Sequence, residues 1–160
     1  MKRINPEHTK ALLELVNCGP YFELLAMKVC DLGVGYSKVE VELQRMHYNP
    51  FGAIHGGVYS SIIDTAAYWS VYYELDESIG YTSLDLSVSN LSMIREGKII
   101  AEGKTIKTGR SICLAEATAK DVNGNLLAYG TSKLMVLSDK QSVKHAIEAM
   151  GYQPLPSKFC

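Results

Sequence analysis

The chain has 160 residues, of which 47% are hydrophobic and 21% charged, a composition typical of one globular domain and not of a disordered or fibrous protein. The 16 Lys and Arg residues nearly balance the 17 Asp and Glu residues, so no strong basic field favours nucleic acid as the main partner. The N-terminal segment lacks the apolar core of a secretory signal, and no two cysteines have C-x-x-C spacing. We expect a single cytoplasmic domain over residues 1–160, with reduced thiols and no metal site.

Helix patterns lie at both ends of the chain. Asn5-Pro6 combines a good N-cap with a proline in the first turn, and it predicts a helix over about residues 5–18. A further helical turn is expected over residues 21–25. Near the C-terminus, residues 138–141 have the spacing of a capping box, so we expect a closing helix over about residues 139–150.

Strand patterns fill most of the remaining chain. Val39, Val41 and Leu43 alternate with polar residues, which is typical of an antiparallel strand with one buried face. Asn123-Gly124 is expected to form a type I′ hairpin turn. Three consecutive antiparallel hairpins after the central segment indicate a curved sheet. The predicted strands are 26–32, 38–44, 82–89, 98–107, 111–122 and 125–137.

The central segment is almost uncharged. Between Met46 and Tyr73, Asp64 is the only formally charged residue. Residues 58–75 predict a helix that is apolar nearly all round, which is either a buried core helix or a membrane span. A carboxylate at the centre of a span costs about 2.5–3.5 kcal/mol, and no basic residues flank the segment. We therefore expect no membrane span, and a core helix wrapped by the sheet.

The residues with the clearest chemical role lie at the start of this helix and two turns into it. His55-Gly56-Gly57 lies where a loop turns into the helix, so the first backbone N–H groups are expected to be uncovered and able to polarise a carbonyl oxygen. Asp64 follows about two turns later. A buried, unpaired carboxylate costs several kcal/mol, so it needs either a partner or a catalytic role.

These residues resemble a known family. An Asn-Pro-x-Gly-x-x-His-Gly-Gly loop, then an Asp nine residues after the His, is similar to the hotdog-fold acyl-CoA thioesterases of the PaaI-like group, over about residues 21–137. The resemblance implies an α+β hotdog fold, a curved antiparallel sheet wrapped around a long central helix, with extra N- and C-terminal helices. Asn90 and Ser92-Met93 depart from the aromatic and Arg-Pro often found there, so acyl specificity is expected to differ.

The resemblance also implies roles for individual residues. Asp64 would be the general base or nucleophile, and the Gly56 N–H would polarise the thioester carbonyl. Asn49 would help to hold the carbonyl or the water, and His55 would position the loop or the thioester. Ser83 matches a hydroxyl that, in some relatives, helps to orient the attacking water.

The substrate and the assembly are likewise implied by the resemblance. Gly57, Gly109 and Arg110 are candidates for substrate binding, and Arg110 suits the phosphates of coenzyme A. The substrate would be an acyl-CoA, with no cofactor beyond its own coenzyme A. In such enzymes the loop of one subunit faces the Asp of its partner, so a homodimer or homotetramer is expected.

Other functions compete with this interpretation. Asp64 can be a polar core contact, and His55 and Asn49 can be loop or turn residues without a chemical role. Gly56 and Gly57 can simply allow close packing of the helix on the sheet. A Ser or Cys nucleophile lacks a G-x-S-x-G elbow in this chain. Hotdog dehydratases pair a His with an acid at another spacing. A non-catalytic acyl-CoA binder or sensor also remains, and thioester turnover separates it from an enzyme.

Overall fold

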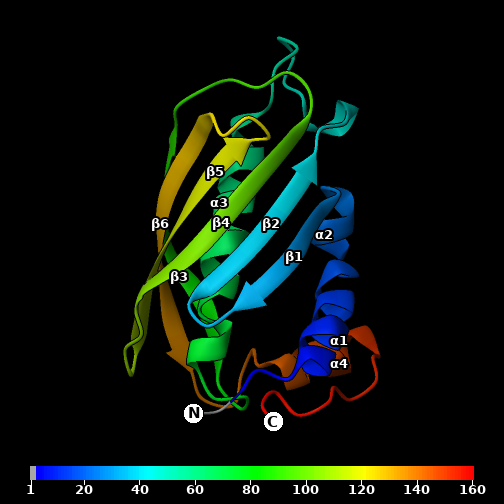
Figure 1. Ribbon diagram of the computed structural model, residues 1–160, viewed down its shortest axis with the longest axis vertical. Coiled ribbons are helices and arrows are strands. Elements are labelled where there is room, and N and C mark those ends of the chain that lie inside the picture. Colours follow the sequence, from blue (N-terminus) through cyan, green and yellow to red (C-terminus); the bar gives the residue numbers. More distant parts are fainter. Residues whose placement is uncertain (1–2) are drawn as a thin grey trace.

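A curved antiparallel sheet of six strands wraps around one long helix in the computed structural model, which describes residues 3–160 (Figure 1). The remaining helices lie beside the sheet, with α1 and α4 at the end that holds the C-terminus. This is the expected α+β hotdog architecture with extra N- and C-terminal helices. The helices are α1 (Pro6–Asn17), α2 (Pro20–Leu24), α3 (Gly56–Ser70) and α4 (Val143–Met150), with the short 3-10 turns η1 (Arg45–His47) and η2 (Tyr72–Glu74).

The strand order differs from a run of hairpins. The sheet has the order β1-β2-β4-β5-β6-β3, so β3 pairs with β6 and not with β4. The connection over residues 91–97 crosses the end of the sheet between them (Figure 1). The prediction of three consecutive hairpins was therefore wrong, because alternation identifies a strand but not its neighbour. The strands are β1 (Met27–Gly33), β2 (Tyr36–Glu42), β3 (Gly80–Asn90), β4 (Lys98–Lys107), β5 (Ile112–Asp121) and β6 (Leu126–Leu137).

The central helix α3 is buried on most of its surface. Ile62 and Ile63 are fully buried, as the all-round apolar pattern predicted. The sheet approaches closely at Gly103, where an added Cβ would overlap with the Ala66 carbonyl oxygen. The helix begins two residues before the predicted start and ends at Ser70, and η2 covers most of the predicted remainder. Within residues 3–160, no helix is long and apolar enough to span a membrane.

Two local predictions need correction. At Asn123-Gly124 only the glycine has a positive φ, of 84°, whereas a type I′ turn requires it at both residues. The Asp121 carboxylate accepts N–H bonds from Asn123 and Asn125 at 2.9 Å each, which stabilises a different turn. The closing helix starts at Val143, with Ser142 as its N-cap. Positive φ angles of 53° at Asp139 and 52° at Gln141 keep the predicted first residues out of it.

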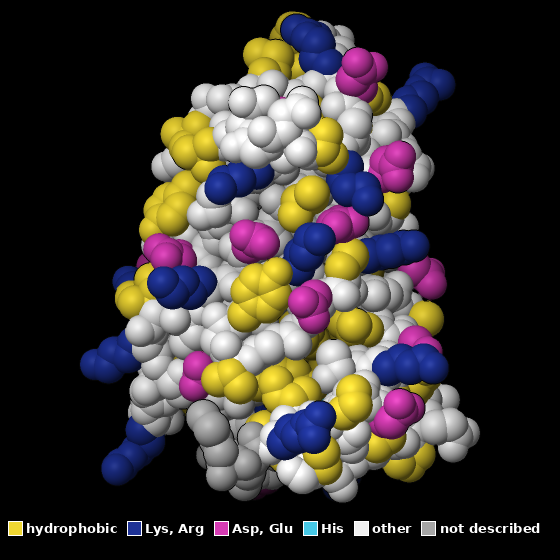
Figure 2. Space-filling model, viewed as in Figure 1, with side chains coloured by type: hydrophobic (Ala, Val, Ile, Leu, Met, Phe, Trp, Pro, Cys, Tyr) yellow, Lys and Arg dark blue, Asp and Glu magenta, His cyan; other side chains and the backbone are white. Residues whose placement is uncertain are grey.

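One edge strand of the sheet is partly covered, and the other is exposed. Along β1, the Asn17 side chain donates to the Val29 carbonyl at 3.0 Å and accepts from the Val29 N–H at 2.9 Å, so α1 covers part of that edge. Along β3, Leu84 and Leu86 are 54% and 38% exposed. An exposed strand edge is a template for pairing with another chain. On the broad face of the sheet, Lys and Arg side chains are interspersed with Asp and Glu, and neither sign dominates (Figure 2).

Candidate active site

The loop before α3 is folded by Asn49. Its side-chain oxygen accepts from the backbone N–H groups of Phe51 at 2.9 Å and Ala53 at 3.2 Å, and its amide donates to the Ile54 carbonyl at 3.2 Å. These bonds pin both limbs of the loop to one side chain. Asn49 thus holds the shape of the loop, and its predicted contact with the carbonyl or the water stays a prediction.

His55 forms the N-cap of α3. Its Nδ1 accepts from the Gly57 N–H at 2.9 Å, which places the ring proton of neutral His55 on Nε2. The His55 N–H in turn donates to the carbonyl of buried His47 at 2.8 Å. The sequence predicted that both glycine N–H groups would be uncovered, but that of Gly57 is already bonded. No described residue caps the Gly56 N–H, so this group can meet a ligand oxygen at the helix start.

Gly56 lies against a wall that a larger residue would disturb. A Cβ at this position would lie 2.8 Å from the Asn90 side-chain nitrogen. Asn49, Gly56 and Asn90 line one hollow of about 340 Å³. From the sequence, Asn90 was only a departure from the family pattern, and its place beside Gly56 follows from the fold, because β3 ends next to the start of α3.

Asp64 lies in a second hollow, of about 380 Å³, which also includes Ser60, Ser61 and Leu86. The Ser83 hydroxyl donates to the Asp64 Oδ1 at 2.8 Å, so the predicted pairing of these two residues is present. Burial raises the pKa of the Asp64 carboxyl above its usual range, and the bond from Ser83 offsets part of that rise. Within the described residues, Asp64 forms no ion pair, so no cation offsets the desolvation of this carboxylate.

The predicted site residues fall into separate groups in one chain. Asp64 lies eight positions after Gly56 in the helix, which is about 12 Å along the axis. Gly109 and Arg110 lie in the turn between β4 and β5, which is at the opposite end of the sheet from the loop before α3 (Figure 1). The structure brings Asp64 to Ser83 and Asn49 to Gly56, but it brings neither pair to the other.

Aromatic residues that were expected to belong to the core also reach the site. Tyr68 and Trp69 line the hollow that holds Asp64, together with Tyr21 and Phe22 of α2. Tyr68 is four residues after Asp64, so helical spacing already places the two on one face. In the part of the chain that the structure describes, no three His, Cys, Asp or Glu side chains cluster as metal ligands, and Cys18, Cys30, Cys113 and Cys160 are free thiols.

Comparison with known proteins gives a consistent result. The family model described as the thioesterase superfamily matches residues 51–128, from the loop before α3 into β6. "Putative esterase SSO2140" of Saccharolobus solfataricus is 25% identical over 123 residues, which are 77% of this chain and 87% of that protein. A "Putative esterase" of Haemophilus influenzae is 23% identical over 114 residues, 71% of this chain and 83% of that protein.

A solved structure has the same fold. The crystal structure of thioesterase HI1161 from Haemophilus influenzae superposes with a TM-score of 0.78 at 20% identity, over 88% of this chain and 98% of that chain. The match of the family model covers the loop from residue 51, α3 with Asp64, the strands β3, β4 and β5, and the start of β6. The chain therefore has the hotdog fold, and its residues 51–128 match the family model of the thioesterase superfamily.

Proposed function

We infer that the protein is an acyl-CoA thioesterase that hydrolyses a thioester to a free acid and coenzyme A. The observation that carries this proposal is Asp64, a half-buried carboxylate that lines a hollow and that, among residues 3–160, receives one hydroxyl bond but no cation. Its relatives are named esterases or thioesterases, which supports a hydrolytic role for this carboxylate. The PaaI-like subgroup is compatible with these names and remains part of the proposal.

The chemistry can run in two ways from the same carboxylate. As a general base, Asp64 accepts a proton from water while the hydroxide attacks the thioester carbonyl carbon. The oxyanion that forms is stabilised by the Gly56 N–H at the positive end of α3. The C–S bond then breaks, and the departing thiolate takes back the proton. As a nucleophile, the Asp64 carboxylate attacks the carbonyl carbon, the C–S bond breaks, and coenzyme A leaves as its thiolate. Water then hydrolyses the resulting anhydride to the free acid and regenerates the Asp64 carboxylate, and the proton released goes to the thiolate. Neither route needs a metal.

The separation of the two halves of the site favours a site shared between two chains. About 12 Å lies between Gly56 and Asp64 in one chain, too far for both to act on one carbonyl. A two-fold pairing of the open β3 edges runs the two strands antiparallel, so the loop of one chain comes to the level of Asp64 in its partner. The same pairing carries the turn with Arg110 toward the partner's loop, where its guanidinium suits the coenzyme A phosphates.

A mixing experiment tests the shared site. Asp64→Asn and Gly56→Val should each be nearly inactive, the second because its side chain would meet Asn90. In a mixed dimer, one of the two sites receives Gly56 from one chain and Asp64 from the other, and is intact. Random mixing should restore about a quarter of wild-type activity. Mixtures as inactive as the single variants, or an active wild-type monomer in sedimentation, would rule out the shared site.

Hydrolysis itself is tested by thiol release from a panel of acyl-CoAs. The enzyme proposal expects turnover, whereas the alternative, a non-catalytic acyl-CoA binder, expects saturable binding without thiol release. Asp31→Asn is a matched control for Asp64→Asn, because Asp31 is an exposed carboxylate on β1, the opposite edge strand from β3. Asp31→Asn should hydrolyse thioesters like the wild type. Binding without thiol release in the wild type would replace the enzyme with the binder.

A further inference from the structure

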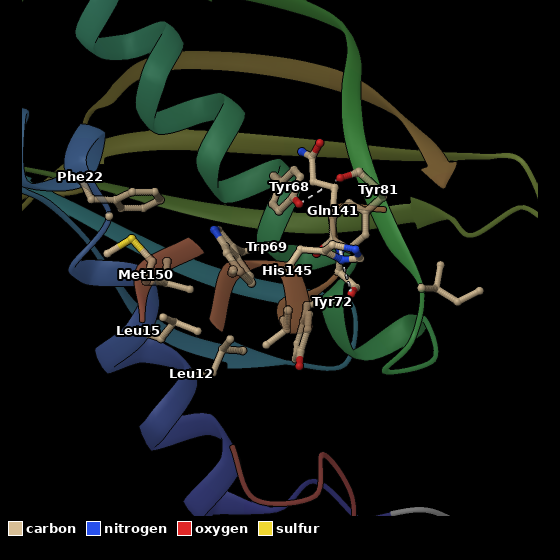
Figure 3. A pocket seen from close by; sticks show the side chains of 16 residues that line it. Leu12, Leu15, Phe22, Tyr68, Trp69, Tyr72, Tyr81, Gln141, His145 and Met150 are labelled. Atoms are coloured by element: carbon tan, nitrogen blue, oxygen red, sulfur yellow. Dashed lines mark hydrogen bonds between the residues drawn. The ribbon is translucent and has the colours of Figure 1, made fainter. Parts of the chain in front are cut away.

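A cavity of about 340 Å³ lies between the terminal helices and α3. Leu12 and Leu15 of α1, Val143, Ala146 and Met150 of α4, and Trp69 of α3 contribute to its walls (Figure 3). A volume of this size falls within the range of small-molecule sites in proteins. The cavity depends on α1 and α4, which lie outside the hotdog core of sheet and central helix.

This cavity adjoins the hollow that holds Asp64. Phe22, Tyr68 and Trp69 line both spaces, so the two meet at these three side chains. All three are half-buried, and the Tyr68 hydroxyl donates to the Tyr81 carbonyl at 3.0 Å. Asp64 and Tyr68 are four residues apart on one face of α3. A ligand with one end at the Asp64 carboxylate that extends along this face therefore contacts Tyr68 and then reaches the cavity.

The chemistry of the cavity walls is apolar and uncharged. No Lys, Arg, Asp or Glu is among the described residues that line it. Several of its polar side chains are paired: the Ser142 hydroxyl and the His145 Nδ1 lie 2.9 Å apart, and Gln141 bonds to Tyr68. The buried Tyr81 hydroxyl has no hydrogen-bond partner among the described residues. A ligand there gains from burial of apolar surface and finds no charge to neutralise.

We propose that this cavity holds the distal part of an unbranched aliphatic acyl chain whose thioester lies at Asp64, an assignment that rests on the proposed thioesterase function. The elongated space formed by the hollow and the cavity suits an extended chain, whereas an aryl group fills only one of the two. The terminal helices thus set the acyl specificity of the site.

Chain-length dependence of kcat/KM tests the proposal. Thiol release from acetyl-, butyryl-, hexanoyl- and octanoyl-CoA should rise by up to about fourfold per methylene until the cavity is filled, which follows from the free energy of burying a CH₂ group. Benzoyl-CoA should be hydrolysed less efficiently than octanoyl-CoA. A flat profile among these straight chains, or a preference for benzoyl-CoA, would overturn the assignment.

Filling the cavity gives a sharper test. Ala146→Phe places a ring in the cavity from α4, and it should lower the octanoyl-to-acetyl ratio of kcat/KM at least about tenfold. Ala149→Phe is the matched control, because Ala149 is an exposed alanine of the same helix that does not line the cavity. It should keep the wild-type ratio. If Ala146→Phe folds poorly by circular dichroism, Ala146→Leu tests the same wall with a smaller side chain.

A binding measurement separates this proposal from the hydrolytic one. Trp69 is the only tryptophan of the chain, and it lines both spaces. The non-hydrolysable thioether octyl-CoA should therefore change the Trp69 fluorescence in a saturable way, and ethyl-CoA should change it much less. Ala146→Phe should abolish that difference, and Ala149→Phe should preserve it.

The combined outcomes distinguish the two failures. A chain-length-dependent fluorescence change without any thiol release would keep the cavity assignment and overturn the hydrolase. Thiol release together with equal fluorescence responses to ethyl- and octyl-CoA would keep the hydrolase and overturn the cavity assignment.

Discussion

Asp64 in the middle of α3 and Lys158 in the C-terminal tail, next to η2, are both ionisable, and their surroundings differ. Lys158 is 1% exposed, and its ammonium donates to the Tyr72 and Leu75 carbonyls at 2.6 Å each and lies 3.9 Å from the centroid of the Tyr72 ring. Asp64 is half-buried, accepts one bond from Ser83 and opens onto a hollow. Protein groups offset the desolvation cost of the Lys158 ammonium, but they offset only part of the desolvation cost of the Asp64 carboxylate.

The comparison indicates that Lys158 has a structural role. Lys158 fastens the C-terminal tail beneath η2, and the backbone bond from Asn5 N–H to the Lys158 carbonyl at 3.1 Å ties the N-terminus to the same place. Buried His8 adds a contact of 2.6 Å to the Tyr72 hydroxyl. A fully bonded group of this kind stabilises the fold, whereas an incompletely compensated carboxylate in a hollow retains the basicity that a reaction can use.

The largest expected effect separates the two residues by activity. Asp64→Asn keeps the size of the side chain but removes its basicity, so kcat for acyl-CoA hydrolysis should fall at least about a hundredfold. Burial raises the pKa of Asp64 in the folded protein above its value in the unfolded chain. The free energy of unfolding therefore falls as the pH rises from the unfolded-state pKa to the folded-state pKa, because Asp64 ionises more easily in the unfolded chain. The variant should therefore unfold at no lower a temperature than the wild type at neutral pH. Activity within a fewfold of wild type would make Asp64 structural.

The converse effect is expected at Lys158. Lys158→Met leaves two buried carbonyl oxygens without their ammonium donor, which should lower the free energy of unfolding by about 3 kcal/mol. Urea denaturation measures the loss. The kcat of the folded variant should equal that of the wild type, because Lys158 lines neither of the hollows at Asp64 and Gly56. If Lys158→Met lowers kcat as well as the free energy of unfolding, Lys158 is not purely structural and does not differ from Asp64 in this way.

A smaller effect is expected at the partner of the carboxylate. The Ser83 bond favours the ionised form of Asp64, so Ser83→Ala should raise the pKa of Asp64 further. The acidic limb of the pH profile of kcat/KM should then move to higher pH, with a loss of less than about tenfold on the plateau. If the acidic limb of the variant lies at the same pH as that of the wild type, Asp64 does not control this titration.

The smallest expected effect concerns metal ions. The proposed reaction uses a carboxylate, backbone dipoles and water, so exhaustive treatment with EDTA should leave kcat unchanged. Thiol release before and after dialysis against the chelator measures this. Loss of activity that one added metal ion restores would contradict the carboxylate mechanism for Asp64.

Local sequence patterns determined much of the fold and of the site. Alternation at Val39 and Val41 identified a half-buried strand, because the period of two is a property of the strand itself. The uncharged segment around Asp64 identified a buried helix for the same local reason. The loop motif that ends at His55 identified the helix start and its cap, since capping depends on neighbours in sequence.

Only the tertiary structure decided the long-range arrangement. The pairing of β3 with β6, the covered edge at β1 and the open edge at β3 depend on strands that lie far apart in the chain. Lys158 and Tyr72 are 86 positions apart, and no periodicity in the tail predicts their contact. The same holds for the cavity between α1, α3 and α4. Such contacts arise because closing the hydrophobic core brings distant surfaces together, and their free energy is realised only when the whole sheet has wrapped α3.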